Sequence, residues 1–194
     1  MENSGKHTQF ATARLVEMSV FAGLSYVLMF LSLPIIPIVP YMKLDLADFP
    51  ILLGTVLFGP VGGMTIAGLK ALLYWVTTGV GLISFIGVGS SLISSLVLIW
   101  AYYLADRFIS FASGWRKATL VILIMAVSLM IIMSLTNWLG VIPLYMNLMQ
   151  MKLGFPLTTV ILFGAVPFNL IKGLVVGTVF YLIKNSFLPR LKLR

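Results

Sequence analysis

Long apolar runs separated by short polar segments make up most of this chain, and they constrain its fold more than any other feature. A run of about 20 apolar residues crosses the hydrocarbon of a bilayer as a helix. Hydrophobic residues make up 60% of the chain and charged residues 9%, whereas soluble domains carry about 25% charged residues. Membrane β-barrels show weaker, alternating segments instead. The sequence therefore predicts an all-α integral membrane protein.

Reactive side chains are scarce. The chain has no cysteine, one histidine (His7) and five acidic residues. We therefore expect no metal site, no catalytic residues and no enzyme activity. The net charge of +8 raises the question of nucleic acid, but the basic residues lie mostly in short segments between apolar runs, where they act as topology signals. No nucleic-acid partner is expected.

The number of spans depends on residues 49–79, where "GPVGG" interrupts an apolar stretch. This stretch forms either one span or a short helix followed by a second one. Lys and Arg collect on cytoplasmic flanks, and five spans would export either the N-terminus or the basic tail. Six spans place nine of the thirteen basic residues inside: Lys6, Arg14, Arg107, Arg116, Lys117, Lys184, Arg190, Lys192 and Arg194.

Six spans are therefore predicted, with both termini cytoplasmic. The expected helices are about 14–33, 49–58, 60–78, 82–105, 117–142 and 158–185. The second helix is short, roughly 15 Å, so its ends need neighbouring helices to cover them. Residues 1–194 are expected to form a single transmembrane domain, multi-pass in the cell membrane and surrounded by lipid.

Three polar residues within the spans require an explanation. Asn169 and Lys172 are three residues apart and share a helix face. A lysine in hydrocarbon costs roughly 3 kcal/mol. With Asn137, near the outer end of the fifth span, they are placed to line one cavity open to the outside. The alternative for each Asn is a bond between helices, worth about 1 kcal/mol. Asp45 or Asp48 reaches Lys172 only if the loop before the second helix folds inward.

Other features have two interpretations each. The proline-rich loop 34–50 is a connector or a lid that prolines keep in one shape. Outer aromatic residues such as Tyr145 form an interfacial belt or walls for a flat ligand. Lys70 extends to the outer interface or has a function within the membrane. In the first helix, Ser19 and Gly23, with Ala22 beside them, form a smooth face for close approach of another helix, from this chain or a partner.

Taken in order, "YMKLDLADFPILLGTVLFGPVGGMTIAGLKALL", "NWLGVIPLYM" and "PFNLIKG" resemble the riboflavin-specific S components (RibU type) of energy-coupling factor (ECF) transporters. The resemblance runs from about Arg14 to the end of the sixth predicted helix. It implies six helices, cytoplasmic termini and capture of riboflavin from outside as the transported ligand, with no cofactor. It also implies docking on a membrane T component with two cytoplasmic ABC-type ATPases.

The resemblance also implies roles for particular residues. Polar groups of the fifth and sixth helices would hold the flavin ring, and the loop around Leu44 to Asp48 would close on it. The small-residue face would dock the T component, with Ser-x-x-x-Gly here in place of the family's Ala-x-x-x-Ala. The expected ligand-binding residues are Asn137, Asn169, Lys172, Leu44, Asp45, Asp48 and Tyr145, and the expected docking residues are Ser19, Ala22 and Gly23.

Three other functions are weighed against this one. An S component for another vitamin, such as thiamine or biotin, would have the same fold, although the positive Lys172 disfavours a cationic ligand. An autonomous secondary transporter often carries inverted repeats with paired broken helices, and we find one break, at "FGPVGG". An intramembrane enzyme would need an activated nucleophile, and the spans show no matching set of residues.

Overall fold

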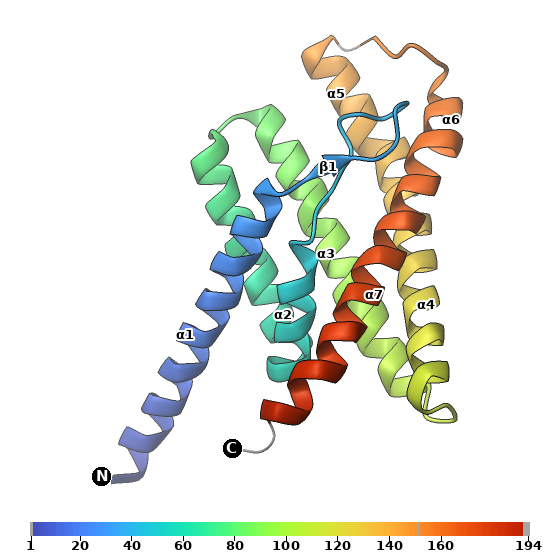
Figure 1. The fold of residues 1–194 in the computed structure, drawn as a ribbon. Helices are drawn as coiled ribbons and strands as arrows, with labels where there is room; N and C mark the ends of the chain where they lie inside the picture. Colours follow the sequence, from blue (N-terminus) through green and yellow to red (C-terminus); the bar gives the residue numbers. More distant parts are fainter. Residues whose placement is uncertain (1, 151, 192–194) are drawn as a thin grey trace.

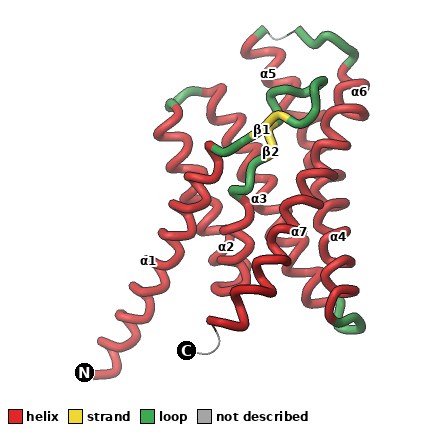
Figure 2. The backbone as a smooth tube through the Cα atoms, viewed as in Figure 1, coloured by secondary structure: helices red, strands yellow, loops and turns green. Residues whose placement is uncertain are grey.

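The computed structural model describes residues 2–150 and 152–191 as a helical bundle with one short two-stranded ribbon (Figures 1 and 2). The predicted basic residues Lys192 and Arg194 lie outside the described residues. The elements are α1 (Glu2–Phe30), β1 (Leu33–Pro34), β2 (Lys43–Leu44), α2 (Asp48–Thr78), α3 (Leu82–Phe108), α4 (Gly114–Thr136), η1 (Asn137–Val141), α5 (Ile142–Met149), α6 (Leu157–Val160), η2 (Ile161–Ala165) and α7 (Val166–Leu191).

Within the described part of the chain, five helices are long and apolar enough to cross a membrane. They are Thr12–Phe30, Asp48–Thr78, Leu82–Phe108, Gly114–Met149 and Leu157–Ser186. Many large apolar side chains on them are exposed, Leu15, Val20 and Phe163 among them. In water such a surface would be unfavourable, but in a bilayer it faces lipid tails. The chain is an all-α, multi-pass membrane protein.

The helix α2 folds back on itself at Gly59. That residue has φ 80° and ψ 178°, a non-helical conformation in the region that favours glycine, and Pro60 follows it. A Cβ atom placed on Gly54 would lie 2.1 Å from Cδ1 of Ile66. In a straight helix these residues would be roughly 18 Å apart along the axis. The two arms, 48–58 and 60–78, therefore pack against each other as a hairpin.

The bundle has two distinct ends (Figure 1). The first turns of α1, the last turns of α7 and the connection between α3 and α4 lie together at one end, which we call the terminal end. At the other, the loop end, lie residues 31–47, the turn between α2 and α3 and the connection between α5 and α6. The basic residues Arg107, Arg116 and Lys117 flank the α3–α4 connection and so belong to the terminal end.

Several helices extend beyond their predicted bounds, since α1 begins at Glu2 rather than near 14 and α3 ends at Phe108 rather than 105. The fifth predicted helix, expected to end at 142, continues from α4 through the π-helical η1 and α5 to Met149. Pro143 does not stop it, because the π-helical turn directly before it, where the N–H of Ile142 bonds to the carbonyl of Asn137, accommodates a residue that has no N–H. The last helix, expected at 158–185, begins at Leu157, contains the π-helical η2 and continues to Leu191.

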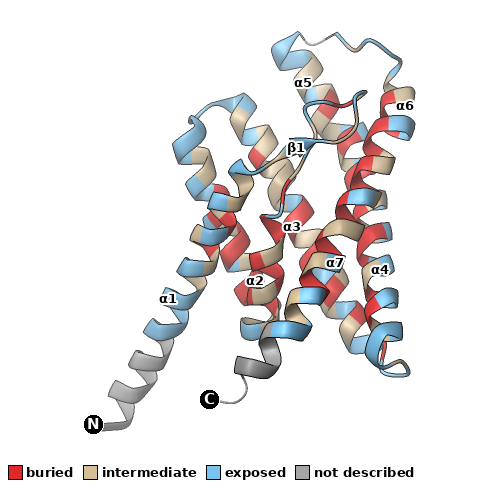
Figure 3. Ribbon diagram, in the orientation of Figure 1, coloured by how far each residue is buried: buried red, intermediate tan, exposed pale blue. Residues whose placement is uncertain are grey.

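The largest core cluster lies where α3, α4 and α7 meet the first arm of α2, and buried residues concentrate on these helices (Figure 3). Its members include Leu98, Met125 and Phe180. α4 and α7 approach each other closely at Gly173, where an added Cβ would lie 2.5 Å from Cα of Ala126. This glycine follows Lys172 directly, so the close contact also sets the position of that lysine.

Residues 31–47, which we call the β-loop, cross the loop end from α1 toward α5 and α6 (Figure 1). β1 and β2 pair antiparallel with Leu33 opposite Leu44. Near the tip, Val39 is fully buried in a cluster with Ile142 and Val160. Burying a valine side chain contributes about 1.5–3 kcal/mol. Gly164 makes room for it, since an added Cβ there would lie 2.5 Å from Cγ1 of Val39.

We predict that Gly173→Ala destabilises the protein by about 1–3 kcal/mol, because the new methyl group meets the backbone of α4 and forces the helices apart. The matched control is Gly89→Ala on α3, where an added Cβ meets nothing within 4 Å. That change is expected to be neutral or slightly stabilising, as Gly to Ala usually is within a helix. Thermal unfolding in detergent measures both, and equal midpoints for the two variants would contradict the close contact.

Candidate functional site

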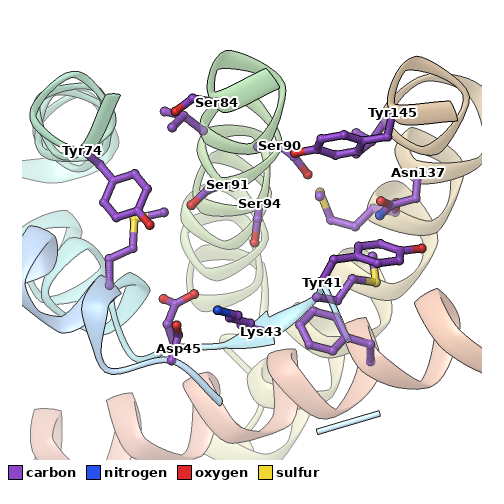
Figure 4. Close-up of a pocket in the computed structure, with 18 of the residues that line it drawn as sticks. Tyr41, Lys43, Asp45, Tyr74, Ser84, Ser90, Ser91, Ser94, Asn137 and Tyr145 are labelled. Carbon is purple, nitrogen blue, oxygen red and sulfur yellow. The ribbon is translucent and has the colours of Figure 1, made fainter. Parts of the chain in front are cut away.

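A cavity of about 560 Å³ opens between the β-loop, the second arm of α2, α3, the α4–α5 helix and α7 (Figure 4). Its volume falls within the range of about 300–1,000 Å³ that is usual for small-molecule sites. The labelled side chains point inward from several elements: Tyr41, Lys43 and Asp45 from the β-loop, Tyr74 from α2, four serines from α3, and Asn137 and Tyr145 from the α4–α5 helix.

A cluster of buried charges joins the floor of this cavity to the β-loop. Nζ of Lys172 lies 3.0 Å from Oδ2 of Asp48 and 3.6 Å from Oδ2 of Asp45. Oδ1 of Asp45 accepts a hydrogen bond of 2.9 Å from the backbone N–H of Ala47, which fixes this carboxylate. The carbonyl of Ala47 in turn accepts a hydrogen bond from the hydroxyl of Ser25 in α1.

Lys70 completes the cluster from the second arm of α2. Its Nζ lies 3.8 Å from Oδ1 of Asp48 and donates to the hydroxyls of Ser91 at 3.2 Å and Ser95 at 3.1 Å. The hydroxyl of Ser95 donates to Oδ1 of Asp48 at 2.5 Å. The interpretation of Lys70 as a lysine that extends to the outer interface is wrong, because the side chain is only 1% exposed. The reversal of α2 brings the carboxylate of Asp48 close enough to pair with Lys70.

The cluster contains two carboxylates and two ammonium groups, so its net charge is zero. Removing ions from water costs several kcal/mol each, and their mutual attraction offsets this only with good geometry and further hydrogen bonds. Here the serines of α3 supply those bonds. Because the four charges come from the β-loop, both arms of α2 and α7, the cluster is complete only when all these elements are in place.

Two asparagines stand in the cavity wall beside irregular helical turns. Asn137 is the first residue of η1, and its Nδ2 donates to the carbonyl of Met133 at 2.6 Å. Nδ2 of Asn169 donates at 2.8 Å to the carbonyl of Ala165, the last residue of η2. π-helical turns occur often at functional sites. These bonds hold each amide by its nitrogen, so its oxygen is oriented away from the carbonyl that the nitrogen binds.

Apolar and aromatic groups form the rest of the wall. Phe168, Met133 and Val88 line the cavity together with the rings of Tyr74 and Tyr145. Tyr41 adds a hydroxyl from the β-loop, and partial burial raises the pKa of Tyr41, so this hydroxyl stays protonated and able to donate. Flat apolar walls with a few fixed polar groups are typical of sites for aromatic small molecules.

The structure brings together most of the residues that the sequence predicts for ligand binding. Those that line the cavity are Asn137, Asn169, Lys172, Asp45 and Tyr145. Asp48 is buried behind the wall, where it binds Lys172, and Leu44 is half-buried in β2; neither lines the cavity. Of the three residues predicted for docking, Ser19 is exposed and Gly23 half-buried, whereas Ala22 is buried against α2 and α3.

Sequence reasoning missed the side of the cavity formed by α3. Ser84, Ser90, Ser91 and Ser94 all line it (Figure 4). Ser91 follows Ser84 by seven residues, and Ser94 follows Ser91 by three and Ser90 by four. These spacings bring side chains to one side of an apolar helix, so they were a usable signal. The ion pair between Lys70 and Asp48 had no comparable signal in the sequence, because it depends on how sharply α2 reverses at Gly59.

The site is suited to binding rather than to reaction. Donors from Lys172 and the serines, acceptors from the asparagines, and flat apolar walls can hold an uncharged aromatic molecule with polar edges. Among the side chains that the structure describes, residues 12–150 and 152–186, no group of three or more His, Asp or Glu lies close enough together to hold a metal ion.

Comparison with known proteins gives a family match. Residues 13–184 match the model of the ECF transporter, substrate-specific component. The chain is 34% identical over 185 residues to the riboflavin transporter RibU of Staphylococcus aureus, covering 92% of this chain and 93% of that protein. It is 28% identical over 179 residues to the riboflavin transporter FmnP of Bacillus subtilis, covering 91% and 92%.

A solved structure, of the S component of a bacterial ECF transporter, has a similar fold. It superimposes with a TM-score of 0.77 at 28% sequence identity, over 94% of this chain and 99% of the other. The similarity therefore extends over nearly the whole of both chains.

We predict that Asp48→Asn destabilises the protein by about 3–5 kcal/mol, because it leaves two buried ammonium groups with one carboxylate. The double variant Asp48→Asn/Lys70→Met restores a net charge of zero and is expected to recover part of that loss. Chemical or thermal unfolding of the purified protein measures the free-energy differences, which should not be additive.

The matched control is Asp106→Asn near the terminal end, where Asp106 pairs with Lys117 at 3.1 Å and is 36% exposed. Partly exposed pairs contribute about 0–1 kcal/mol, so this variant should change stability little. If the double variant proved less stable than Asp48→Asn alone, unbalanced charge would not be the reason for the loss.

Proposed function

The chain belongs to the family of substrate-specific components of ECF transporters, and from this premise we propose that it captures riboflavin at the outer face of the cell membrane for ATP-driven uptake. As a member of a family of transport components, it is not an enzyme, and riboflavin is its cargo, not a cofactor. Two relatives that match this chain over more than nine-tenths of their own length are named riboflavin transporters. They come from Staphylococcus aureus and Bacillus subtilis.

The observation that carries the proposal is the convergence of Asn137, Asn169 and Lys172 on one cavity with aromatic walls. The pyrimidine edge of the flavin ring offers two carbonyl oxygens and an N–H between them. An ammonium group donates to a carbonyl oxygen, and an amide oxygen accepts from the N–H. The dimethylbenzene edge requires apolar walls, which Phe168 and Met133 help to provide.

The proposal includes a six-helix topology with both termini in the cytoplasm. The reversal at Gly59 supports it, because each arm of α2 then counts as one helix and the first arm is short. Basic residues around the terminal end also support it, since Lys and Arg favour the cytoplasmic side. The cavity at the loop end then faces the outside, where the vitamin is found.

The β-loop is proposed to close over bound ligand with the segment Leu44–Asp48. Support comes from the ion pair of Asp45 with Lys172 and from the burial of Val39 against η2 and α5. Both contacts hold the loop across the cavity and exclude water from the polar groups beneath, which strengthens their hydrogen bonds. In this proposal Asp45 and Asp48 contribute to ligand binding by holding Lys172, and Leu44 contributes through the backbone of β2.

The proposed partners are a membrane T component and two cytoplasmic ABC-type ATPases, which supply the energy that this chain does not. The alternative ligand is another vitamin. Titration of purified protein with riboflavin, followed by quenching of flavin fluorescence, separates the two. We expect saturable quenching with riboflavin and no protection against thermal unfolding by thiamine or biotin. Protection by either of those vitamins, with no quenching by riboflavin, would reverse the assignment.

We predict that Asn169→Ala weakens riboflavin binding at least tenfold, or about 1.4 kcal/mol, because it removes a fixed polar contact to the ring. Asn137→Ala should act similarly. The control is Asn147→Ala in α5, an exposed asparagine that does not line the cavity. Fluorescence titration gives each dissociation constant, and unchanged binding in both cavity variants would exclude the asparagines from the site.

We predict that Ser19→Trp or Gly23→Trp abolishes riboflavin uptake into vesicles that contain the complete transporter, while the isolated chain still binds riboflavin. Both residues lie on an accessible flank of α1, and an added Cβ on Gly23 meets nothing within 4 Å, so a large side chain blocks only an external partner. Leu24→Trp is the control, because Leu24 is 46% exposed on a different side of the same helix. Joint loss of binding and uptake would place the face inside this chain's own fold.

A further inference from the structure

The cavity wall formed by α3 carries hydroxyl groups that the contacts proposed for the flavin ring do not use. Ser84, Ser90, Ser91 and Ser94 face the cavity (Figure 4). From Ser90 to Ser94 the helix rises roughly 6 Å, which is comparable to the length of an extended five-carbon chain. Three hydroxyls over that distance form a short polar track in an otherwise apolar helix.

Ser94 is the member of this track whose hydroxyl is buried without a hydrogen-bond partner in the described part of the chain. Its side chain is 4% exposed, and among the described residues its Oγ makes no hydrogen bond. Serines in apolar helices commonly bond to the carbonyl four residues earlier, as Ser19 does with Leu15 at 2.9 Å. A buried hydroxyl without a partner destabilises the folded state. Because Ser94 lines the cavity, a ligand bound there is in a position to supply the missing hydrogen bond.

The neighbouring Ser91 has one fixed bond. Its Oγ accepts from Nζ of Lys70 at 3.2 Å, so its proton is free to be donated into the cavity. Between Ser84 and Ser90, the hydroxyl of Tyr145 fills the space beside Gly87, since an added Cβ there would lie 2.9 Å from it. That hydroxyl therefore approaches the track from the opposite wall.

We infer that Ser90, Ser91 and Ser94 bind the polyhydroxylated chain of the ligand and that Ser94 makes the site prefer a ligand that carries such a chain. The inference rests on the proposed function. The chemistry fits because each hydroxyl of a polyol both donates and accepts, so it completes the bond of Ser94 and accepts the free proton of Ser91. A flavin ring alone has no flexible group that would follow this wall.

The test uses two flavins that share the ring. Riboflavin carries a ribityl chain, and lumiflavin carries a methyl group at the same nitrogen. We expect Ser94→Ala to weaken riboflavin binding about fivefold, the ratio for one hydrogen bond of about 1 kcal/mol, and to leave lumiflavin binding unchanged. The ligand-free variant should be at least as stable to heat as the unaltered chain, because an unpaired buried hydroxyl is gone.

The matched control is Ser134→Ala in α4. Its Oγ is also buried without a hydrogen-bond partner within the described chain, but Ser134 does not line the cavity. This variant should leave both dissociation constants unchanged. A second variant, Ser90→Ala, should weaken riboflavin binding selectively if the chain follows the track.

Each other outcome overturns the inference. Equal weakening of riboflavin and lumiflavin by Ser94→Ala would mean that the serine affects the ring or the shape of the cavity. Unchanged binding of both would mean that the polyol lies elsewhere. In both cases the unaltered chain still binds riboflavin, so the proposed function stands. Failure of the unaltered chain to bind either flavin would overturn the proposed function and this inference together.

Discussion

Lys172 lies between the carboxylates of Asp45 and Asp48, in a region that the packing of four elements largely closes to water. Charges in such a place are tolerated because they balance and because serines of α3 satisfy the remaining hydrogen bonds. The same lysine also lines the cavity. One ammonium group therefore ties the β-loop to α7 and also lines the cavity that the loop borders, so the position of the loop and the charge in the cavity depend on each other.

The reversal of α2 is what makes this arrangement possible. Asp48 begins the first arm and Lys70 lies in the second, and in a continuous helix they would be roughly 33 Å apart. The glycine conformation at Gly59 turns the chain, and Gly63 lets the arms approach, since a Cβ there would lie 2.1 Å from Oγ1 of Thr55. Because the first arm is short, it places Asp48 at the level of the cavity floor, where the ion pairs form.

Helix positions, the interruption at "FGPVGG" and the shared face of Asn169 and Lys172 could be predicted from the sequence, since they depend on local hydropathy and spacing. The partners of Lys70 and Lys172 could not, because pairing depends on the three-dimensional course of α2 and the β-loop. The continuation through Pro143 was missed because a proline inside a helix usually breaks or kinks it, and the sequence did not reveal the π-helical turn that accommodates this one. The serines of α3 were missed although their spacing was visible. Hydroxyls weigh little in a hydropathy profile, and only the cavity shows that they face a ligand site.

The burial of the ion pair between Asp45 and Lys172 also determines how strongly dissolved salt affects the attachment of the β-loop. Salt in solution screens charges that water surrounds, and it has much less effect on charges enclosed by protein. The contact that holds the β-loop down is enclosed, and its other main contact, the buried Val39, is apolar. A change in the salt concentration around the protein should therefore affect the attachment of the β-loop far less than it affects exposed ion pairs.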